Sequence, residues 1–150
     1  MASPLFPRQA DNSYRGHRLA LWILGLVVLL NLVIGFNSTL NPGNVAVNAD
    51  GIPLDSFPAA AAQTVLGLFA LVGFSRIVIC LVCIVIFLRY RALVPLAFAM
   101  LLVSQIGGQI VHLIHPMPRT GAPIGPTVII GILVVTAIGF GLSLWDRGRA

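Results

Sequence analysis

Charged residues are scarce in this chain of 150 residues, and lysine is absent altogether. Lysine and arginine together number nine, aspartate and glutamate together number four, and charged residues make up 9% of the sequence. Soluble globular domains average about 25% charged residues, so the composition excludes an ordinary soluble domain. Hydrophobic residues account for 58%, and the mean hydropathy of +1.00 is typical of a membrane protein.

Acidic residues are also absent from every long apolar segment of the chain. Small multidrug exporters couple transport to an intramembrane carboxylate, so this absence argues against a proton-coupled transporter of that kind. The sequence has no Gly-rich phosphate loop, no carboxylate pair suited to acid–base chemistry and no nucleophile beside a base. Nothing therefore supports an enzymatic function, and we expect no cofactor.

Four long apolar segments set the predicted fold. Each has about 18 residues or more, close to the roughly 20 that a helix needs to cross a bilayer. None alternates polar and apolar residues as barrel strands do, so helices are expected. We predict an all-α integral membrane protein, a single four-transmembrane-helix bundle with an irregular external loop between helices 1 and 2. The predicted spans are residues 19–36, 59–88, 93–115 and 127–145.

The arginines outside the predicted spans gather on one side of the membrane. Only Arg119 lies on the other side, so the positive-inside rule places both termini in the cytoplasm of a bacterial inner membrane. A net charge of +5 is then explained by anionic lipid headgroups, and we expect the lipid bilayer rather than nucleic acid as a partner. The arginines on the cytoplasmic side are Arg8, Arg15, Arg18, Arg89, Arg91, Arg147 and Arg149.

A polar cluster is predicted around Arg76, the only charged residue between positions 59 and 88. A charge at mid-membrane costs roughly 2.5 to 3.5 kcal/mol, so it calls for a partner. Asn31 and Gln105 lie at a similar depth, and their amide oxygens can accept hydrogen bonds from a guanidinium. Gln105, Gln109 and His112 share one helical face. The predicted cluster, either structural or ligand-binding, comprises Asn31, Arg76, Gln105, Gln109 and His112.

If this cluster binds a ligand, the arginine favours an anionic or carbonyl-bearing molecule, such as a lipid headgroup, a carboxylate or a quinone. If it is structural, the amides alone satisfy Arg76 within the helices. The sequence leaves both interpretations open.

Two further motifs are weaker candidates. Cys80 and Cys83 form a Cys-x-x-Cys pair, which we interpret as packing residues because they lie far from a helix N-terminus that would activate a thiol. A redox role is the alternative. His112, His115 and Met117 could together contact copper or zinc, but such scattered residues make a poor ligand set, and we predict no metal site.

The predicted external loop, residues 37–58, contains turn-forming and apolar residues and is expected to fold over the helix ends. It carries two of the four acids, Asp50 and Asp55. They are interpreted either as turn and cap residues or as contacts for a cation or polar group at the helix mouth.

Small residues recur along the fourth predicted span and predict close helix contacts within the bundle. Homo-oligomerisation through this span is the alternative. One set comprises Thr127, Gly131, Gly139 and Ser143, and a second comprises Ala137 and Gly141.

Three stretches of sequence resemble a group of small four-span bacterial inner-membrane proteins with no known activity. They are residues 50–57 (DGIPLDSF), residues 69–71 (FAL) with Ser75 and Arg76, and residues 89–95 (RYRALVP). The resemblance covers roughly positions 41–126. It implies a bacterial inner-membrane setting and no particular chemistry.

The leading functional hypothesis is a non-enzymatic accessory, assembly or interaction subunit that contacts another membrane protein or a second copy of itself. A small-molecule binding or redox module that uses the Arg76 cluster is the alternative. A small transporter is a second alternative.

Overall fold

The structure, a computed structural model, describes residue 5, residues 11–14 and residues 16–145. Within these residues it contains helices and no strand, which confirms the predicted all-α class. Four helices are long and apolar enough to cross a membrane and indicate a multi-pass membrane protein. They are α1 (Arg18–Leu40), α3 (Ala59–Arg89), α4 (Val94–Ile114), which the short 3-10 turn η3 (Arg91–Leu93) precedes, and α5 (Gly125–Leu144).

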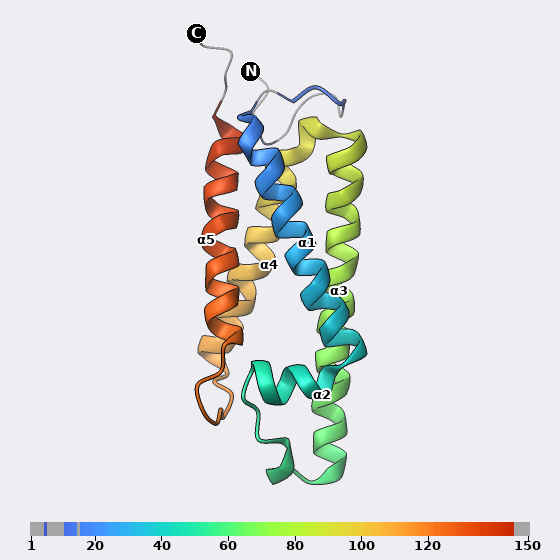
Figure 1. The fold of residues 1–150 in the computed structure, drawn as a ribbon, viewed down its shortest axis with the longest axis vertical. Helices are drawn as coiled ribbons and strands as arrows, with labels where there is room; N and C mark the ends of the chain where they lie inside the picture. Colours follow the sequence, from blue (N-terminus) through green and yellow to red (C-terminus); the bar gives the residue numbers. More distant parts are fainter. Residues whose placement is uncertain (1–4, 6–10, 15, 146–150) are drawn as a thin grey trace.

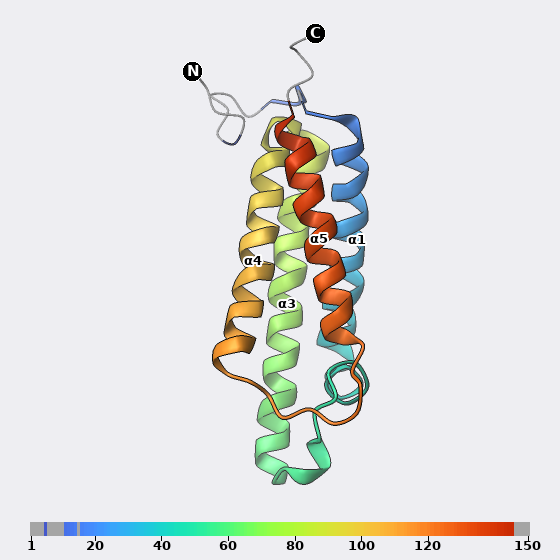
Figure 2. The same cartoon turned by 90° about the vertical axis from the view of Figure 1, so that its left-hand side faces the viewer.

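The four long helices lie side by side and alternate in direction (Figure 1, Figure 2). Helix α1 packs along both α3 and α5, and α5 packs along α4, whereas α3 and α4 meet over a shorter stretch. The chain enters α1 and leaves α5 at one end, where His17 N donates a hydrogen bond to Leu142 O at 3.1 Å. We call this the terminal end, and the opposite end the loop end.

Helix α1 continues to Leu40, four residues beyond the predicted span end at Phe36. Polar residues follow Phe36, but they do not break the helix because Thr39 Oγ1 donates to Gly35 O at 2.8 Å. Ser38 is buried on the face that meets α3. Local hydrogen bonds of this kind let hydroxyl side chains remain in a helix that would otherwise end.

The closest approach of α1 and α3 occurs at two glycines. A β-carbon at Gly73 would lie 2.7 Å from Gly35 O and 2.8 Å from Ser38 Cβ. A β-carbon at Gly35 would in turn lie 2.9 Å from Ile77 Cγ1. Small residues permit such close packing between membrane helices, where apolar surface alone gives little drive to associate.

The helix interior divides into two halves of different polarity. Near the terminal end it is a continuous apolar core contributed by all four long helices. On α4 the fully or nearly buried apolar residues stop at Leu101, and the next interior position is Gln105. The core residues are Ala20, Leu24, Val27, Val28, Cys80, Cys83, Ile86, Val94, Ala97, Phe98, Leu101 and Ile132.

The segment between α1 and α3 is partly helical. Helix α2 (Pro42–Asn44) continues into η1 (Val45–Ala49), a π-helical stretch, and both run across the long helices (Figure 1). The 3-10 turn η2 (Leu54–Ser56) follows. Residues 42–49 are therefore more regular than the irregular loop that the sequence predicts.

This segment packs inward and is joined to the loop between α4 and α5. Ala46 is fully buried and Ile52 is 4% exposed. Thr120 donates to Gly51 O from its main-chain nitrogen at 2.7 Å and from its hydroxyl at 3.2 Å. Gly51 has φ of +70°, a left-handed conformation that glycine adopts at little cost. The two loops thus form one cover over the loop end.

Candidate functional site

The predicted polar cluster lies where the apolar core ends. Asn31, Arg76 and Gln105 are 13, 13 and 11 residues from the terminal ends of their helices. At 1.5 Å per residue they share a depth of roughly 17 to 20 Å. The structure therefore brings the three side chains to one level, but it does not pair them in the predicted way.

The side-chain amide of Asn31 donates a hydrogen bond within its own helix. Its side chain is 4% exposed, and Nδ2 donates to Val27 O at 2.8 Å. Among the residues that the structure describes, its side chain makes no hydrogen bond to another helix. Asn31 thus supports the interior of α1 rather than Arg76.

Gln105 is paired across helices with a residue that the sequence analysis did not include. Its Nε2 donates to Thr136 Oγ1 on α5 at 3.3 Å, and Thr136 is fully buried. The Thr136 hydroxyl donates to Ile132 O at 2.6 Å. Gln105 is 9% exposed, and its Oε1 is buried without a hydrogen-bond donor in the described part of the chain.

Arg76 extends from the face of α3 that also carries the buried residues Gly73 and Cys80. The side chain is half-buried. Within the described ranges, no residue forms a hydrogen bond or an ion pair with its guanidinium. Its five N–H donors therefore have no protein acceptor among the described residues.

Asp50 lies at the end of η1 and is the acidic residue that interacts with Arg76 and with two further basic side chains. Burial raises the pKa of Asp50, while the charges of Arg119, His112 and Arg76, in decreasing order, offset part of that rise. The three basic residues come from the α4–α5 loop, from α4 and from α3, respectively. Asp50 therefore lies within electrostatic range of basic side chains from three elements at the loop end.

The Asp50 carboxylate also lies at the N-terminus of α5. A β-carbon at Gly125 would come within 2.5 Å of Asp50 Oδ1 and 2.8 Å of Ala49 O. The N-cap residue of α5, Ile124, provides no side-chain hydrogen bond to the helix. A carboxylate in this position is stabilised by the positive end of the helix dipole.

The remaining predicted residues follow the face of α4 toward the loop end. Gln109 and His112 are half-buried, and His112 Nδ1 is buried with no hydrogen-bond partner among the described residues. His115 and Met117 are exposed. In the described ranges, no group of three or more His, Cys, Asp or Glu side chains is placed to hold a metal ion.

Both cysteines lie on α3, and Cys80 is one helical turn from Arg76 on the same face. Cys80 and Cys83 are free thiols that are fully buried in the apolar core. A buried free thiol packs as a small apolar side chain.

We call Asp50, Arg76, Gln105 and His112 the polar site, because Asp50 interacts electrostatically with Arg76 and His112, and Gln105 shares the face of α4 that carries His112. Together with the neighbouring Arg119, and with histidine neutral, these residues carry a formal charge of +1. The buried atoms of the polar site include one orphaned acceptor, Gln105 Oε1, and one orphaned ring nitrogen, His112 Nδ1. Such a group of unpaired polar atoms can bind a small anionic molecule that also donates a hydrogen bond.

Two residues of this region were missed or left undecided by the sequence analysis. Thr136 could have been recognised as the one polar residue at the middle of an otherwise apolar span, at a depth that matches Gln105. For Asp50, the sequence left two interpretations open, a turn or cap residue and a contact for a cation or polar group. The electrostatic interaction of Asp50 with three basic side chains favours the second.

Comparison of the chain with protein-family models, with curated proteins and with solved structures gives no match in any of the three. The chemistry of the site is therefore the only guide to the function of this chain.

Proposed function

We propose that this protein is a multi-pass inner-membrane protein that binds a small anionic molecule in the polar site. The ligand would carry an anionic oxygen group, such as a carboxylate, and at least one hydroxyl or amine donor. The anionic group would accept hydrogen bonds from Arg76, and the donor would satisfy Gln105 Oε1. The observation that carries the proposal is the buried oxygen of Gln105, which has no donor among the residues that the structure describes.

An unpaired buried polar atom is costly, which is why it supports a ligand. Leaving a buried acceptor unsatisfied costs about 1 to 3 kcal/mol. A purely structural network would be expected to join Gln105 to Arg76, because the guanidinium has donors to spare. Instead, Gln105 bonds Thr136, and Arg76 makes no hydrogen bond in the described part of the chain. Both side chains therefore keep bonding capacity for a third group.

The site is electropositive, which favours an anion over a cation. The charges of Arg76 and Arg119 outnumber the single carboxylate of Asp50. In a low-dielectric interior an anion beside a guanidinium is stabilised more strongly than in water. Asp50 then keeps the basic groups together before the ligand binds.

Native mass spectrometry of the protein purified from membranes in detergent tests the proposal. We expect the wild type to retain a small anionic molecule, and Arg76→Met and Gln105→Leu to lose it. Arg89→Met and Gln63→Leu serve as matched controls, because both side chains are exposed on α3. Recovery of bulk phospholipid alone, unchanged by Arg76→Met, would contradict the proposal.

We infer further that the terminal end faces the cytoplasm. Among the described arginines, Arg18, Arg89 and Arg91 lie at the terminal end, and only Arg119 lies in the loop at the opposite end. This distribution follows the positive-inside rule. Arg8, Arg15, Arg147 and Arg149 lie outside the described residues. Cysteine-labelling from the outside, with single cysteines at Ser56 and at Ser13 in a cysteine-free background, would check the orientation.

A second candidate function is pairing with another membrane helix through α5. The first predicted set of small residues is split in the structure, with Thr127 and Gly131 exposed and the other two members buried. Gly139 and Ser143 are buried, and a β-carbon at Gly139 would lie 2.5 Å from Phe98 Cε1. Ala137 and Gly141 are exposed, with open space around a β-carbon at Gly141. An exposed small-residue pair favours association with a partner helix, as expected of an accessory subunit.

A further inference from the structure

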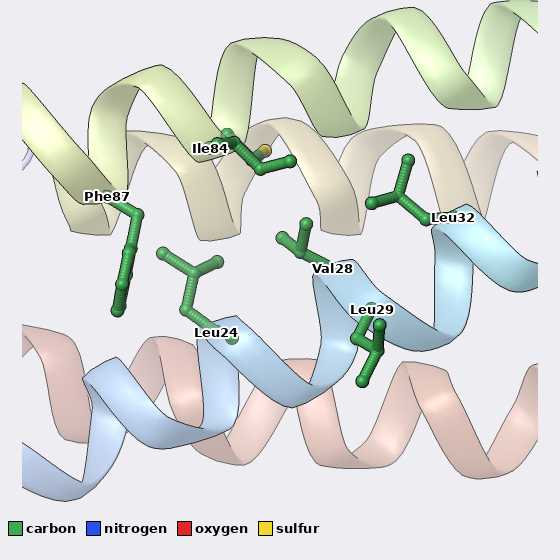
Figure 3. Close-up of a pocket in the computed structure, with 8 residues that line it drawn as sticks. Leu24, Val28, Leu29, Leu32, Ile84 and Phe87 are labelled. Atoms are coloured by element: carbon green, nitrogen blue, oxygen red, sulfur yellow. The ribbon is translucent and has the colours of Figure 1, made fainter.

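A separate feature of the molecule is an apolar pocket of about 220 Å³ between α1 and α3, in the half near the terminal end (Figure 3). Leu24, Val28 and Leu32 line it from α1, and Ile84 and Phe87 line it from α3. Figure 3 shows the side chains of both helices directed into the space between them. The pocket is open on one side, and we call it the groove.

The size of the groove restricts what it can hold. It extends along α1 from Leu24 to Leu32, eight residues or about 12 Å. An α-helix with its side chains is about 10 to 12 Å across, which is too wide for a pocket of this volume. A single extended hydrocarbon chain fits this long and narrow shape.

A cationic group lies at one end of the groove. Arg91 Nε donates to Phe87 O at 3.2 Å, and its guanidinium lies over the Phe87 ring, 5.9 Å from the centroid. Phe87 itself lines the groove. Four further N–H donors of Arg91 have no partner in the described part of the chain. The apolar space and the unpaired cation are thus joined through one residue.

We propose that the groove holds one acyl chain of an anionic phospholipid, whose headgroup phosphate binds Arg91. Apolar surface gives little preference among lipid tails, so shape and charge decide which lipid stays. Arg18 and Arg89 add positive charge at the terminal end. The one acidic residue described at this end is Asp11, which is placed there by a hydrogen bond from Ala92 N to its main-chain carbonyl. One basic residue near an anionic headgroup contributes about 1 kcal/mol.

Gly25 provides a specific way to close the groove. It is one of the lining residues, and a β-carbon there would meet nothing within 4 Å. A leucine at this position would occupy the groove without displacing the core. Gly131 on α5 is exposed with equally open surroundings and lies outside the groove, so Gly131→Leu is the matched control.

Native mass spectrometry in detergent, with added dioleoyl-phosphatidylglycerol or dioleoyl-phosphatidylcholine, tests the proposal. The wild type should retain phosphatidylglycerol over phosphatidylcholine by about fivefold, the equivalent of one arginine contact, because the choline cation of phosphatidylcholine offsets the charge of its phosphate. Arg91→Gln should lose this preference, whereas Arg89→Gln should keep most of it. Gly25→Leu should lose most of the retained lipid of both kinds, and Gly131→Leu should retain it.

Three results would overturn the proposal. The first is a Gly25→Leu protein that retains as much phosphatidylglycerol as the wild type. The second is an equal loss of preference in Arg91→Gln and Arg89→Gln, which would indicate general surface charge. The third is a wild-type dimer that Gly25→Leu abolishes, which would make a second copy the occupant. Gln105→Leu should retain lipid normally, so failure of the polar site would leave this test intact.

Discussion

Gln105 and Thr136 face each other across α4 and α5, and their hydrogen bond uses only the nitrogen of the Gln105 amide. The Thr136 hydroxyl has one proton, and it donates that proton to Ile132 O in its own helix. Thr136 therefore cannot serve the Gln105 oxygen as well. The Gln105 amide is therefore held by its nitrogen, while its oxygen has no donor among the described residues.

This arrangement predicts that Gln105→Leu stabilises the ligand-free protein. The change removes an unsatisfied buried acceptor, while Thr136 keeps its bond to Ile132. We expect the free energy of unfolding to rise by about 1 kcal/mol. Thermal melting in detergent, after dialysis to remove small molecules, measures the effect. Gln63→Leu is the control, and a lower melting temperature for Gln105→Leu than for this control would contradict the prediction.

The opposite result is expected for Thr136→Val. That substitution removes the only described partner of Gln105, so both ends of a buried amide become unsatisfied. We expect a loss of about 1 to 3 kcal/mol in the free energy of unfolding. Combining Thr136→Val with Gln105→Leu should recover most of that loss. The recovery would be absent if Thr136 served only to pack against its neighbours.

The long helices could be predicted from the sequence because each is a predominantly apolar run of sufficient length. Their ends were less predictable. Residues after Phe36 are polar, and nothing local shows that Thr39 bonds back to Gly35 or that Ser38 packs against α3. The helical turns at residues 42–49 likewise depend on burial of Val45 and Ala46 against other elements. Such contacts exist only in the folded chain.

The sequence predicts the depth of Asn31, Arg76 and Gln105 within the bundle, but it does not predict their hydrogen-bond partners. Counting residues along each helix gives the common level of Asn31, Arg76 and Gln105. Counting does not give the rotation of each helix, which decides that Asn31 turns to its own backbone and Gln105 to Thr136. The approach of Asp50 required the packing of both loops over the loop end, which no local pattern encodes.

The close crossing of α1 and α3 predicts a large difference between two glycines of the same helix. Gly73→Ala would bring a β-carbon within 2.8 Å of three atoms of α1, so we expect a loss of about 1 to 3 kcal/mol. Gly67→Ala meets nothing within 4 Å and should be neutral or stabilising by up to about 1 kcal/mol. Thermal melting of both variants measures this, and similar melting temperatures would show that the helices separate easily.

The contact between the two loops predicts that alanine substitution has a larger effect at Gly51 than at Gly121. Both have positive φ, +70° and +74°, so alanine at either position carries a backbone cost of about 1 to 2 kcal/mol. Only at Gly51 would a β-carbon also meet Thr120 O, at 2.7 Å. Trypsin cleavage after Arg119 reports on this contact, because Thr120 N is bonded to Gly51 O. Cleavage should accelerate more in Gly51→Ala than in Gly121→Ala, and equal rates would mean that the loops are not held together here.

Tyr14 predicts how stability responds to alkaline pH. Its hydroxyl donates to His17 O at 3.2 Å, and burial raises the pKa of Tyr14 from 10.0 to about 12. Because the folded pKa exceeds the unfolded one, the contribution of Tyr14 is complete below about pH 10 and is lost as the pH rises toward 12. Melting temperatures measured across this range should fall in the wild type and in Tyr90→Phe, whose side chain is exposed, and fall less in Tyr14→Phe. If all three proteins lose the same stability, the Tyr14 phenol is not buried against the start of α1 as the structure places it.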